Sequence, residues 1–138
     1  MATTSYAKPL PTIGATNKPF WDAAKRHEIR VPRCTACGKL SYPISPHCLH
    51  CWSTEFEWAR LSGRGKVNGF TVYYQAFHEA YRDDVPYNVV EVELDEGPRL
   101  VSNLVGIEND EIKVGMPVVA VFEDVTPEVT LIKFELPS

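Results

Sequence analysis

The stretch Cys34-Thr-Ala-Cys-Gly-Lys-Leu-Ser-Tyr-Pro-Ile-Ser-Pro-His-Cys-Leu-His-Cys51 holds all four cysteines of this 138-residue chain. They form two Cys-x-x-Cys pairs, Cys34 with Cys37 and Cys48 with Cys51, and ten residues separate the pairs. Each short pair turns both of its sulfurs to the same side, so two pairs can surround one tetrahedral ion. The spacing therefore predicts a compact zinc ribbon, in which a fully ligated ion stabilises the fold and leaves no position open for catalysis.

Other uses of the four cysteines agree less well with their surroundings. Disulfides require an oxidising compartment, and residues 1–9 lack the apolar core of a secretory signal. A redox pair of the thioredoxin type opens a helix, whereas turn-forming residues surround both pairs here. An iron site of the rubredoxin type shares the spacing and stays an alternative. His47 and His50 flank the second pair and are candidate replacement ligands, although we expect them to be exposed or to lie behind the cysteines.

Charge is distributed unevenly along the chain. Residues 1–60 hold eight Lys or Arg and four Asp or Glu, whereas residues 61–138 hold six and fourteen. A basic surface is the usual footprint of a nucleic-acid-binding protein, so the acidic second part makes that function the less favoured one. No apolar run has the length needed to span a bilayer, and we expect a soluble, cytoplasmic protein.

Two segments precede the ribbon. Residues 1–16 contain Pro, Gly, Thr and Ser without apolar periodicity and predict a flexible arm, with a strap that lies on a partner as the alternative. Residues 17–28 predict a short helix capped by Asn17 or by the threonine before it. A helix this short is not stable alone in water, so its aromatic face must be buried. That face carries Phe20 and Trp21, which either pack on the chain's own ribbon or barrel or anchor the chain to another subunit.

The rest of the chain divides at the turn Ser62-Gly-Arg-Gly65 into the ribbon, residues 29–61, and a second module, residues 62–138. A hairpin is expected between the two cysteine pairs, over residues 39–46. Beyond the turn, apolar residues alternate with period two, as in half-buried strands. The predicted strands are residues 66–77, 87–94, 99–105, 116–123 and 129–136.

The order of the predicted elements indicates the fold class. A bulge is expected at Gly69, and one short helical turn separates the third strand of the second module from the fourth. This order fits a five-stranded OB-fold barrel, with an SH3-like barrel as the main competitor. The protein is thus predicted to be mainly β, with a short N-terminal helix, a rubredoxin-like zinc ribbon and an OB-fold domain.

The sequence holds no persuasive catalytic set. It has no Gly-x-Ser-x-Gly nucleophile elbow, no phosphate-binding loop and no dinucleotide fingerprint. His78 and Glu79 are candidates for an acid–base pair, but adjacent loop residues usually point apart. Arg64, Lys66 and Arg99 are basic groups at turns of the acidic module, and they are candidates for contact with a phosphate-bearing ligand.

Six ordered segments carry a resemblance to a known family. The segments are Pro19-Phe-Trp21, Arg33-Cys-Thr-Ala-Cys-Gly38, Pro46-His-Cys-Leu-His-Cys51, Ser62-Gly-Arg-Gly-Lys-Val67, Val92-Glu-Leu-Asp-Glu-Gly-Pro-Arg-Leu-Val-Ser-Asn-Leu-Val-Gly106 and Val114-Gly-Met-Pro-Val118. Together they resemble the acyl-CoA-associated family long labelled domain of unknown function thirty-five. The likeness spans residues 17–123 and leaves the arm and the last strand uncovered.

The resemblance implies a non-catalytic partner subunit. Members of this family accompany thiolase-superfamily enzymes, among them thiolases, lipid-transfer-protein-like aldolases and acyltransferases, and some are paired with MaoC-type hydratases. The partner supplies the nucleophilic cysteine, while the ribbon and barrel brace it and help shape the channel for the CoA thioester. The family's metal ligands match Cys34, Cys37, Cys48 and Cys51 one for one.

The sequence therefore predicts a zinc-binding accessory subunit of a heteromeric thiolase-superfamily enzyme that acts on acyl-CoA. Zn²⁺ is the expected structural cofactor, and the CoA thioester is expected at a site shared with the partner. Phe20 and Trp21 are the predicted partner anchors, and Arg64, Lys66 and Arg99 are the predicted contacts for CoA phosphates. The alternative from a different class is an OB-fold protein that binds single-stranded nucleic acid, and a third hypothesis is an independent small enzyme.

Overall fold

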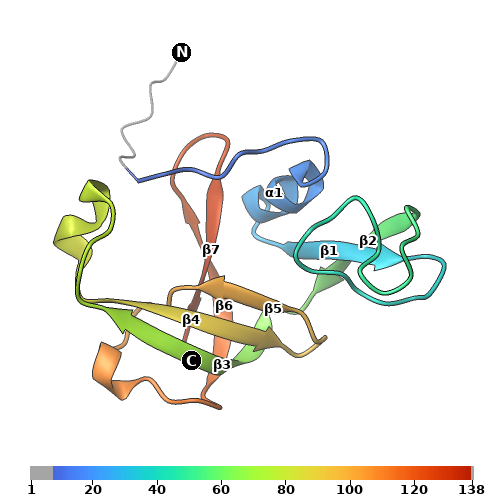
Figure 1. Cartoon of the computed structure of the whole chain (residues 1–138). Coiled ribbons are helices and arrows are strands. Elements are labelled where there is room, and N and C mark those ends of the chain that lie inside the picture. The colour runs from blue at the N-terminus through green and yellow to red at the C-terminus, as the bar shows by residue number, and fades with distance from the viewer. Residues whose placement is uncertain (1–7, 138) are drawn as a thin grey trace.

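The computed structural model describes residues 8–137, which form two antiparallel sheets and one α-helix (Figure 1). The elements in chain order are α1 (Lys18–Lys25), β1 (Ile29–Cys34), β2 (Phe56–Leu61), β3 (Arg64–Tyr73), the 3-10 helix η1 (Glu79–Asp84), β4 (Tyr87–Leu94), β5 (Arg99–Ser102), the 3-10 helix η2 (Asn109–Glu111), β6 (Pro117–Asp124) and β7 (Thr130–Glu135). Among these residues, no helix has the length and apolar character needed to cross a membrane.

The ribbon contains a two-stranded sheet in which β1 and β2 pair antiparallel along their whole lengths. The strand β2 is absent from the sequence prediction. The hairpin expected over residues 39–46 does not form, and that prediction is wrong. Instead Leu40 alone makes a bridge to Arg33 of β1. Pro43 and Pro46 have no N–H group to donate, so this segment cannot extend the ladder.

The strands β3 to β7 form a five-stranded sheet in the order β5-β4-β3-β6-β7. Because β3 pairs with both β4 and β6, the sheet is a Greek key of the kind found in OB-fold barrels. The register shifts between Val67 and Gly69, which confirms the predicted bulge. The five barrel strands and the helical turn η2 are also found, although β3 ends at Tyr73 rather than at residue 77, and β5 ends at Ser102 rather than at residue 105.

Contacts between the segment after β5 and β7 nearly close this sheet into a barrel. Leu104 forms a parallel bridge with Phe134, and the Ser102 hydroxyl donates a hydrogen bond of 2.6 Å to the carbonyl of Ile132. The buried side chain of Asn88 on β4 binds both the N–H and the C=O of Leu104. Backbone groups at this edge of the barrel would otherwise be unpaired, and they find hydrogen-bond partners on both β7 and β4.

One apolar core runs from the ribbon into the barrel. Its buried members are Ile29, Val31, Leu61, Val67, Val90, Val92, Leu94, Leu100, Leu104, Ile112, Val118 and Phe134. Three of them, Ile29, Val31 and Leu61, come from the ribbon strands. Full burial of one such side chain contributes about 1.5–3 kcal/mol, so the shared core holds the two modules together.

The helix α1 packs on β1 and β7 and is tied to the barrel at its end. Just beyond the helix, the His27 ring stacks on Phe122 with centroids 5.0 Å apart, and its Nε2 lies 3.2 Å from Asp124 Oδ1. Asn17 precedes the helix as expected, but its side chain makes no cap and accepts a hydrogen bond from the N–H of Gly14 instead.

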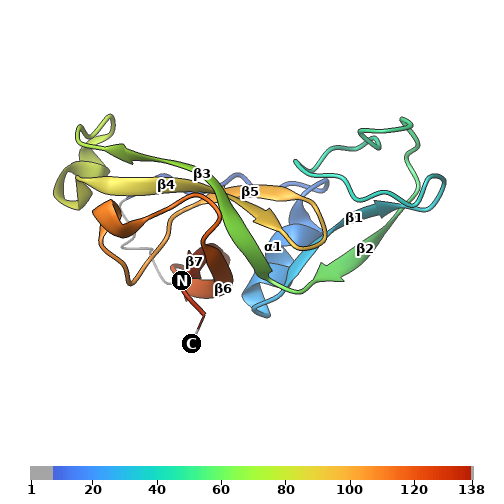
Figure 2. The ribbon, with the colours of Figure 1, turned by 90° about the horizontal axis from the view of Figure 1, so that it is seen from below.

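The N-terminal arm runs over the barrel from Lys8 onward (Figure 1). The ammonium of Lys8 forms a 2.8 Å ion pair with Asp84 in η1, at the end of the barrel. The first part of the predicted arm lies outside the described residues. Figure 2 shows that η1 and the ribbon strands lie at opposite ends of the molecule, with the barrel between them.

Candidate functional site

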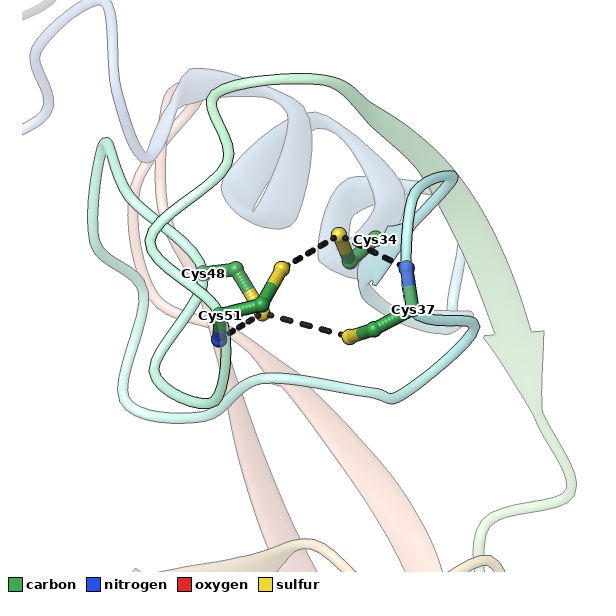
Figure 3. Close-up of side chains that lie close together, drawn as sticks. All are labelled: Cys34, Cys37, Cys48 and Cys51. Carbon is green, nitrogen blue, oxygen red and sulfur yellow. Dashed lines mark hydrogen bonds between the residues drawn. The ribbon is translucent and has the colours of Figure 1, made fainter.

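Four sulfur atoms converge where the two cysteine pairs of the ribbon meet (Figure 3). The Sγ atoms of Cys34, Cys37, Cys48 and Cys51 all lie within 4.8 Å of one another. Cys34 Sγ is 3.5 Å from Cys51 Sγ, and Cys37 Sγ is 3.6 Å from Cys48 Sγ. The two sulfurs of a disulfide are about 2.0 Å apart, so these cysteines are free thiols.

The separations between the sulfurs suit a tetrahedral metal ion. Zinc–sulfur bonds of about 2.3 Å place tetrahedral ligands about 3.8 Å apart, close to the two shortest distances in the cluster. Cys34 and Cys48 are buried, whereas Cys37 and Cys51 are exposed. An ion at this point would therefore be held on the inside by one sulfur of each pair and covered on the outside by the other.

Backbone N–H groups point at the first sulfur of each pair. The N–H of Cys37 donates to Cys34 Sγ at 3.4 Å. The N–H groups of His50 and Cys51 donate to Cys48 Sγ at 3.3 and 3.4 Å. Such hydrogen bonds follow from the tight turn that a Cys-x-x-Cys spacing imposes, and they stabilise a thiolate that binds a cation.

The residue after each pair has a left-handed backbone conformation. Gly38 has a φ of 78° and Trp52 a φ of 68°. Glycine adopts this conformation without steric cost, whereas a residue with a Cβ loses about 1–2 kcal/mol there. The indole of Trp52 is also 76% exposed. The left-handed backbone of Trp52 is therefore imposed by the turn that contains it, because a residue with a Cβ does not favour this conformation by itself.

The same hydrogen bonds change the acidity of the thiols. The N–H of Cys37 lowers the pKa of Cys34 below the ordinary 9.0. Burial acts to raise the pKa of Cys48, but the two N–H donors outweigh it and lower the pKa to about 6. At Cys51 the N–H of Ser53 favours the thiolate, but contacts with the other sulfurs and burial outweigh it and raise the pKa to about 12. Four thiolates so close together require a cation to balance their charge.

The two histidines beside the second pair lie outside the sulfur cluster. His50 Nε2 is 3.2 Å from the carbonyl oxygen of Leu40. The ring of His47 lies near the indole of Trp52, with centroids 6.0 Å apart. Both histidines are exposed and bind other groups, so the geometry favours a set of four sulfurs.

The predicted partner anchors differ in their exposure. Phe20 is 6% exposed, and its ring lies 5.9 Å from that of Tyr42 in the ribbon. Trp21 is half-buried and packs edge-on against Phe20 at 5.2 Å, and both residues line a cavity of about 820 Å³ between α1, the arm and the barrel. Phe20 thus covers the chain's own ribbon, and Trp21 is the more exposed member of the pair. Their contact with a partner stays a prediction.

The predicted CoA contacts lie in different places. Lys66 on β3 and Arg99 on β5 flank Glu93 of β4 in one row across the sheet, each 3.8 Å from its carboxylate. Arg64 is exposed two residues before Lys66, at the start of β3. Of the three, Arg99 lines a groove of about 770 Å³ between the ribbon and the β4–β5 turn.

Sequence reasoning missed the other arginine and the lysine of this groove, which are Arg33 and Lys39. Both belong to the ribbon, more than fifty residues before Arg99 in the chain. Nothing in the local sequence around either residue indicates that they face a turn of the barrel. That these basic residues lie near Arg99 becomes clear only when the positions of the ribbon and the barrel are known.

An exposed aromatic cluster at the end of the barrel away from the ribbon was also missed. The ring of Tyr73 stacks on Tyr87 at 5.3 Å and meets Phe77 edge-on at 6.1 Å. Tyr74 is 77% exposed and Phe77 is 75% exposed. We call Tyr73, Tyr74, Phe77, Tyr81 and Tyr87 the aromatic end. Its rings come largely from the run that the sequence assigned to a longer β3.

His78 and Glu79 do not form the acid–base pair considered from the sequence. His78 Nδ1 accepts a hydrogen bond of 3.0 Å from the N–H of Ala80 and so begins η1. Glu79 lies 3.8 Å from Arg82 at the surface. The His78 side chain therefore caps the start of η1, and the Glu79 side chain lies on the surface of that helix.

Two family models match successive parts of the chain. The rubredoxin-like zinc ribbon domain of ChsH2 matches residues 21–57, and the C-terminal OB-fold domain of ChsH2 matches residues 58–123. The sulfur cluster lies within the first match and most of the barrel within the second. The second match confirms the predicted OB-fold over the SH3-like alternative.

Three known proteins illustrate the likeness. A chain in the solved structure of the Ltp2-ChsH2(DUF35) aldolase is 40% identical, with a TM-score of 0.83 over 92% of this chain and 98% of that one. The probable enoyl-CoA hydratase alpha subunit of Thermomonospora curvata is 41% identical over 90% of this chain, which covers 38% of that protein. Benzoylsuccinyl-CoA thiolase subunit BbsA of Thauera aromatica is 35% identical over 54% of this chain, which covers 49% of that protein.

The present chain thus spans less than half the length of these two curated relatives. The likeness to the chain of the aldolase structure, in contrast, extends along nearly the full length of both. The fold, the sulfur cluster and the sequence agree, and the chain belongs to the DUF35 family of ChsH2-like proteins, in which a rubredoxin-like zinc ribbon precedes an OB-fold domain.

Proposed function

We propose that this chain is a non-catalytic, zinc-binding accessory subunit of a heteromeric thiolase-superfamily enzyme that acts on acyl-CoA. The observation that carries the proposal is the likeness, along nearly the whole chain, to a chain of the Ltp2-ChsH2(DUF35) aldolase. The name of the BbsA relative, a subunit of a thiolase, supports the same kind of assembly. The proposed catalytic partner is a thiolase, a lipid-transfer-protein-like aldolase or an acyltransferase. A MaoC-type hydratase is a further proposed partner, since one relative is named as a hydratase alpha subunit.

The chemistry of the described residues supports an accessory role. All four thiols of the chain lie in the sulfur cluster, so none is left as a nucleophile for acyl transfer. A metal held by four sulfurs has no position for water or substrate. The reacting groups are therefore proposed to come from the partner, and this chain braces them and helps to shape the site for the CoA thioester.

Cys34, Cys37, Cys48 and Cys51 would hold Zn²⁺ in this role. The ion contributes free energy of folding, because it replaces a core that a ribbon of this size cannot build alone. The ribbon strands place three apolar side chains in the core that they share with the barrel. A loaded metal centre would thus keep the ribbon and the barrel in a fixed arrangement, which a docking subunit requires.

The aromatic end is the surface that best fits a partner protein. Tyr74 and Phe77 expose most of their side chains, and aromatic rings of this kind are favoured anchors in protein interfaces. The neighbouring helix η1 carries the carboxylates of Glu79 and Asp83. A complementary surface on the catalytic subunit would be an apolar pocket with a basic rim. Trp21 is proposed as a second, smaller contact.

The decisive experiment is reconstitution with a thiolase- or aldolase-type subunit from the same organism. Native mass spectrometry of the purified mixture should give a hetero-oligomer of defined stoichiometry. Activity with an acyl-CoA substrate should require both chains. Full activity of the catalytic subunit alone, or turnover by this chain alone, contradicts the proposal.

A further inference from the structure

A groove of about 770 Å³ separates the ribbon from the turn between β4 and β5. Its ribbon side is formed by residues around both cysteine pairs, and its barrel side by residues 96–99. Figure 1 and Figure 2 both show this turn on the side of the barrel that faces the ribbon. None of the four cysteines lines the groove, so it is separate from the metal centre.

Three cations line the groove and are available to a ligand. They are Arg33 from β1, Lys39 after the first cysteine pair and Arg99 from β5. The ammonium of Lys39 binds no carboxylate among residues 8–137. Arg33 and Arg99 lie 3.8 Å from Glu57 and Glu93, at the long end of ion-pair distances, with side chains 47% and 55% exposed. Pairs this exposed are weak, so both guanidinium groups can turn toward an anion.

The charge of the groove favours a ligand with several negative charges. Its one carboxylate, Glu96, is occupied elsewhere, because it accepts a hydrogen bond of 2.8 Å from the N–H of Ser62. Three cations thus line the groove together with one engaged carboxylate, in a chain whose formal net charge is −4. The carboxylates of Glu57 and Glu93, 3.8 Å from Arg33 and Arg99, lie outside the lining.

The groove also has an apolar wall. Leu40, Tyr42, Leu49 and Pro98 contribute to its lining. Leu49 is 50% exposed at this position, so it is available for contact with a ligand. An apolar wall beside clustered cations matches a molecule that joins an aromatic ring to phosphate groups.

We propose that this groove binds a nucleotide that carries more than one phosphate. Arg33, Lys39 and Arg99 hold the phosphates, and the base lies against Leu40 and Leu49. The identity of the natural ligand rests on the proposed function, since the phosphorylated adenosine of an acyl-CoA has this chemistry. Arg64 and Lys66 do not line this groove, and their contact with CoA phosphates stays a separate prediction.

Isothermal titration of the zinc-loaded full chain with adenosine 3′,5′-bisphosphate tests this site without the catalytic subunit. The bisphosphate should bind, and adenosine, which lacks phosphate, should bind at least about tenfold more weakly. Affinity should fall as salt rises from about 20 to about 200 mM, since exposed charges are screened. Lys39→Glu and Arg99→Glu should each weaken binding about tenfold.

Arg82→Glu is the matched control, because it reverses one cation with a 73% exposed side chain on η1, at the other end of the molecule. It should change the affinity by less than about twofold. Absence of binding up to about 5 mM bisphosphate, or an equal loss in the control, overturns the proposal. Tighter binding of a single-stranded oligonucleotide through the same residues overturns it in favour of nucleic acid. Successful reconstitution with a catalytic subunit, combined with no nucleotide binding, overturns this inference and leaves the proposed function intact.

Discussion

At the scale of single residues, Cys48 is the ligand on which the metal centre depends most. It is 1% exposed, and two backbone N–H groups donate to its sulfur. Structural zinc is worth about 10–16 kcal/mol of folding free energy in isolated zinc-finger peptides, so loss of one ligand is costly. We predict that Cys48→Ser lowers the zinc content from about one ion per chain to less than about half and disorders the ribbon. Elemental analysis after dialysis and circular dichroism measure both effects.

The histidines next to the cluster provide the matched controls. His47→Ala and His50→Ala should keep the zinc content of the unmodified protein, because neither ring belongs to the sulfur cluster. Loss of zinc in either histidine variant, with retention in Cys48→Ser, would mean that a histidine replaces a cysteine as ligand. Iron rather than zinc in the purified protein would instead indicate the rubredoxin-type alternative.

Asp124 gives a prediction about pH. The Thr130 hydroxyl, which donates a 2.6 Å hydrogen bond, and then His27 lower the pKa of Asp124 below 3.8. Asp124 binds a proton more weakly in the folded state than in the unfolded state. Its ionised carboxylate therefore stabilises the fold at pH values above the ordinary pKa of the group. This contribution is lost as the pH falls through the lowered pKa. Asp124→Asn should therefore unfold at a lower urea concentration at about pH 7, and the difference should shrink toward about pH 2.5.

A control residue lies four positions further on, in the turn between β6 and β7. Glu128 is exposed, and Glu128→Gln should leave the urea midpoint unchanged at both pH values. A constant difference between Asp124→Asn and the unmodified protein across the pH range would show that the effect comes from packing and not from charge.

At the scale of elements, β3 passes very close to β4 at Gly65. A Cβ at this position would lie 2.5 Å from the backbone oxygen of Glu93 and 3.0 Å from Leu94 Cα. Backbone atoms in the middle of a sheet cannot move aside easily. We predict that Gly65→Ala lowers the free energy of unfolding by about 2–3 kcal/mol, as overpacking does in other cores. Urea denaturation followed by tryptophan fluorescence measures the change.

Gly69 in the same strand is the control for Gly65. A Cβ there would have no neighbour within 4 Å. Gly69→Ala should cost less than about 1 kcal/mol or be neutral. An equal cost at both glycines would contradict the close approach of β3 and β4 and would point to the conformational freedom of glycine as the cause.

The elements differ in how far the sequence predicts them. β4 was predictable because Val90, Val92 and Leu94 are buried and alternate with Glu91 and Glu93, a pattern that needs only local sequence. β2 was not, because the metal-binding segment, residues 35–55, separates it in sequence from its partner β1, and because its aromatic side chains fit several environments. A strand defined by a distant partner has a weaker local signal than one defined by its own alternation.

The candidate sites show the same division. The sulfur cluster follows from two short spacings, since each pair of cysteines brings its own turn. The basic groove unites Arg33, Lys39 and Arg99 from two modules, so it depends on how the ribbon packs on the barrel. The sequence grouped Arg99 with Arg64 and Lys66 because all three were expected at turns. In the structure Arg99 instead lines the same groove as Arg33 and Lys39.

At the scale of the whole molecule, the two ends present different chemistry. The ribbon and η1 lie at opposite ends of the molecule (Figure 2). The ribbon carries the sulfur cluster and contributes to the basic groove, whereas exposed aromatic rings lie at the end with η1. Contact with a partner at the aromatic end and contact with a nucleotide at the groove therefore involve different residues of this chain. The two contacts can then be changed independently by substitution.

Simultaneous Tyr74→Ser and Phe77→Ser substitutions test this separation. They should weaken binding to the catalytic subunit about 30-fold or more, because one interface hot spot contributes about 2 kcal/mol or more. Zinc content, the urea midpoint and nucleotide affinity should not change, since both side chains are about three-quarters exposed. Val114→Ser is the control, as this valine is 66% exposed and lies outside the aromatic end. Surface plasmon resonance measures the affinity, and an unchanged value in the double variant would place the interface elsewhere, with Trp21 as the next candidate.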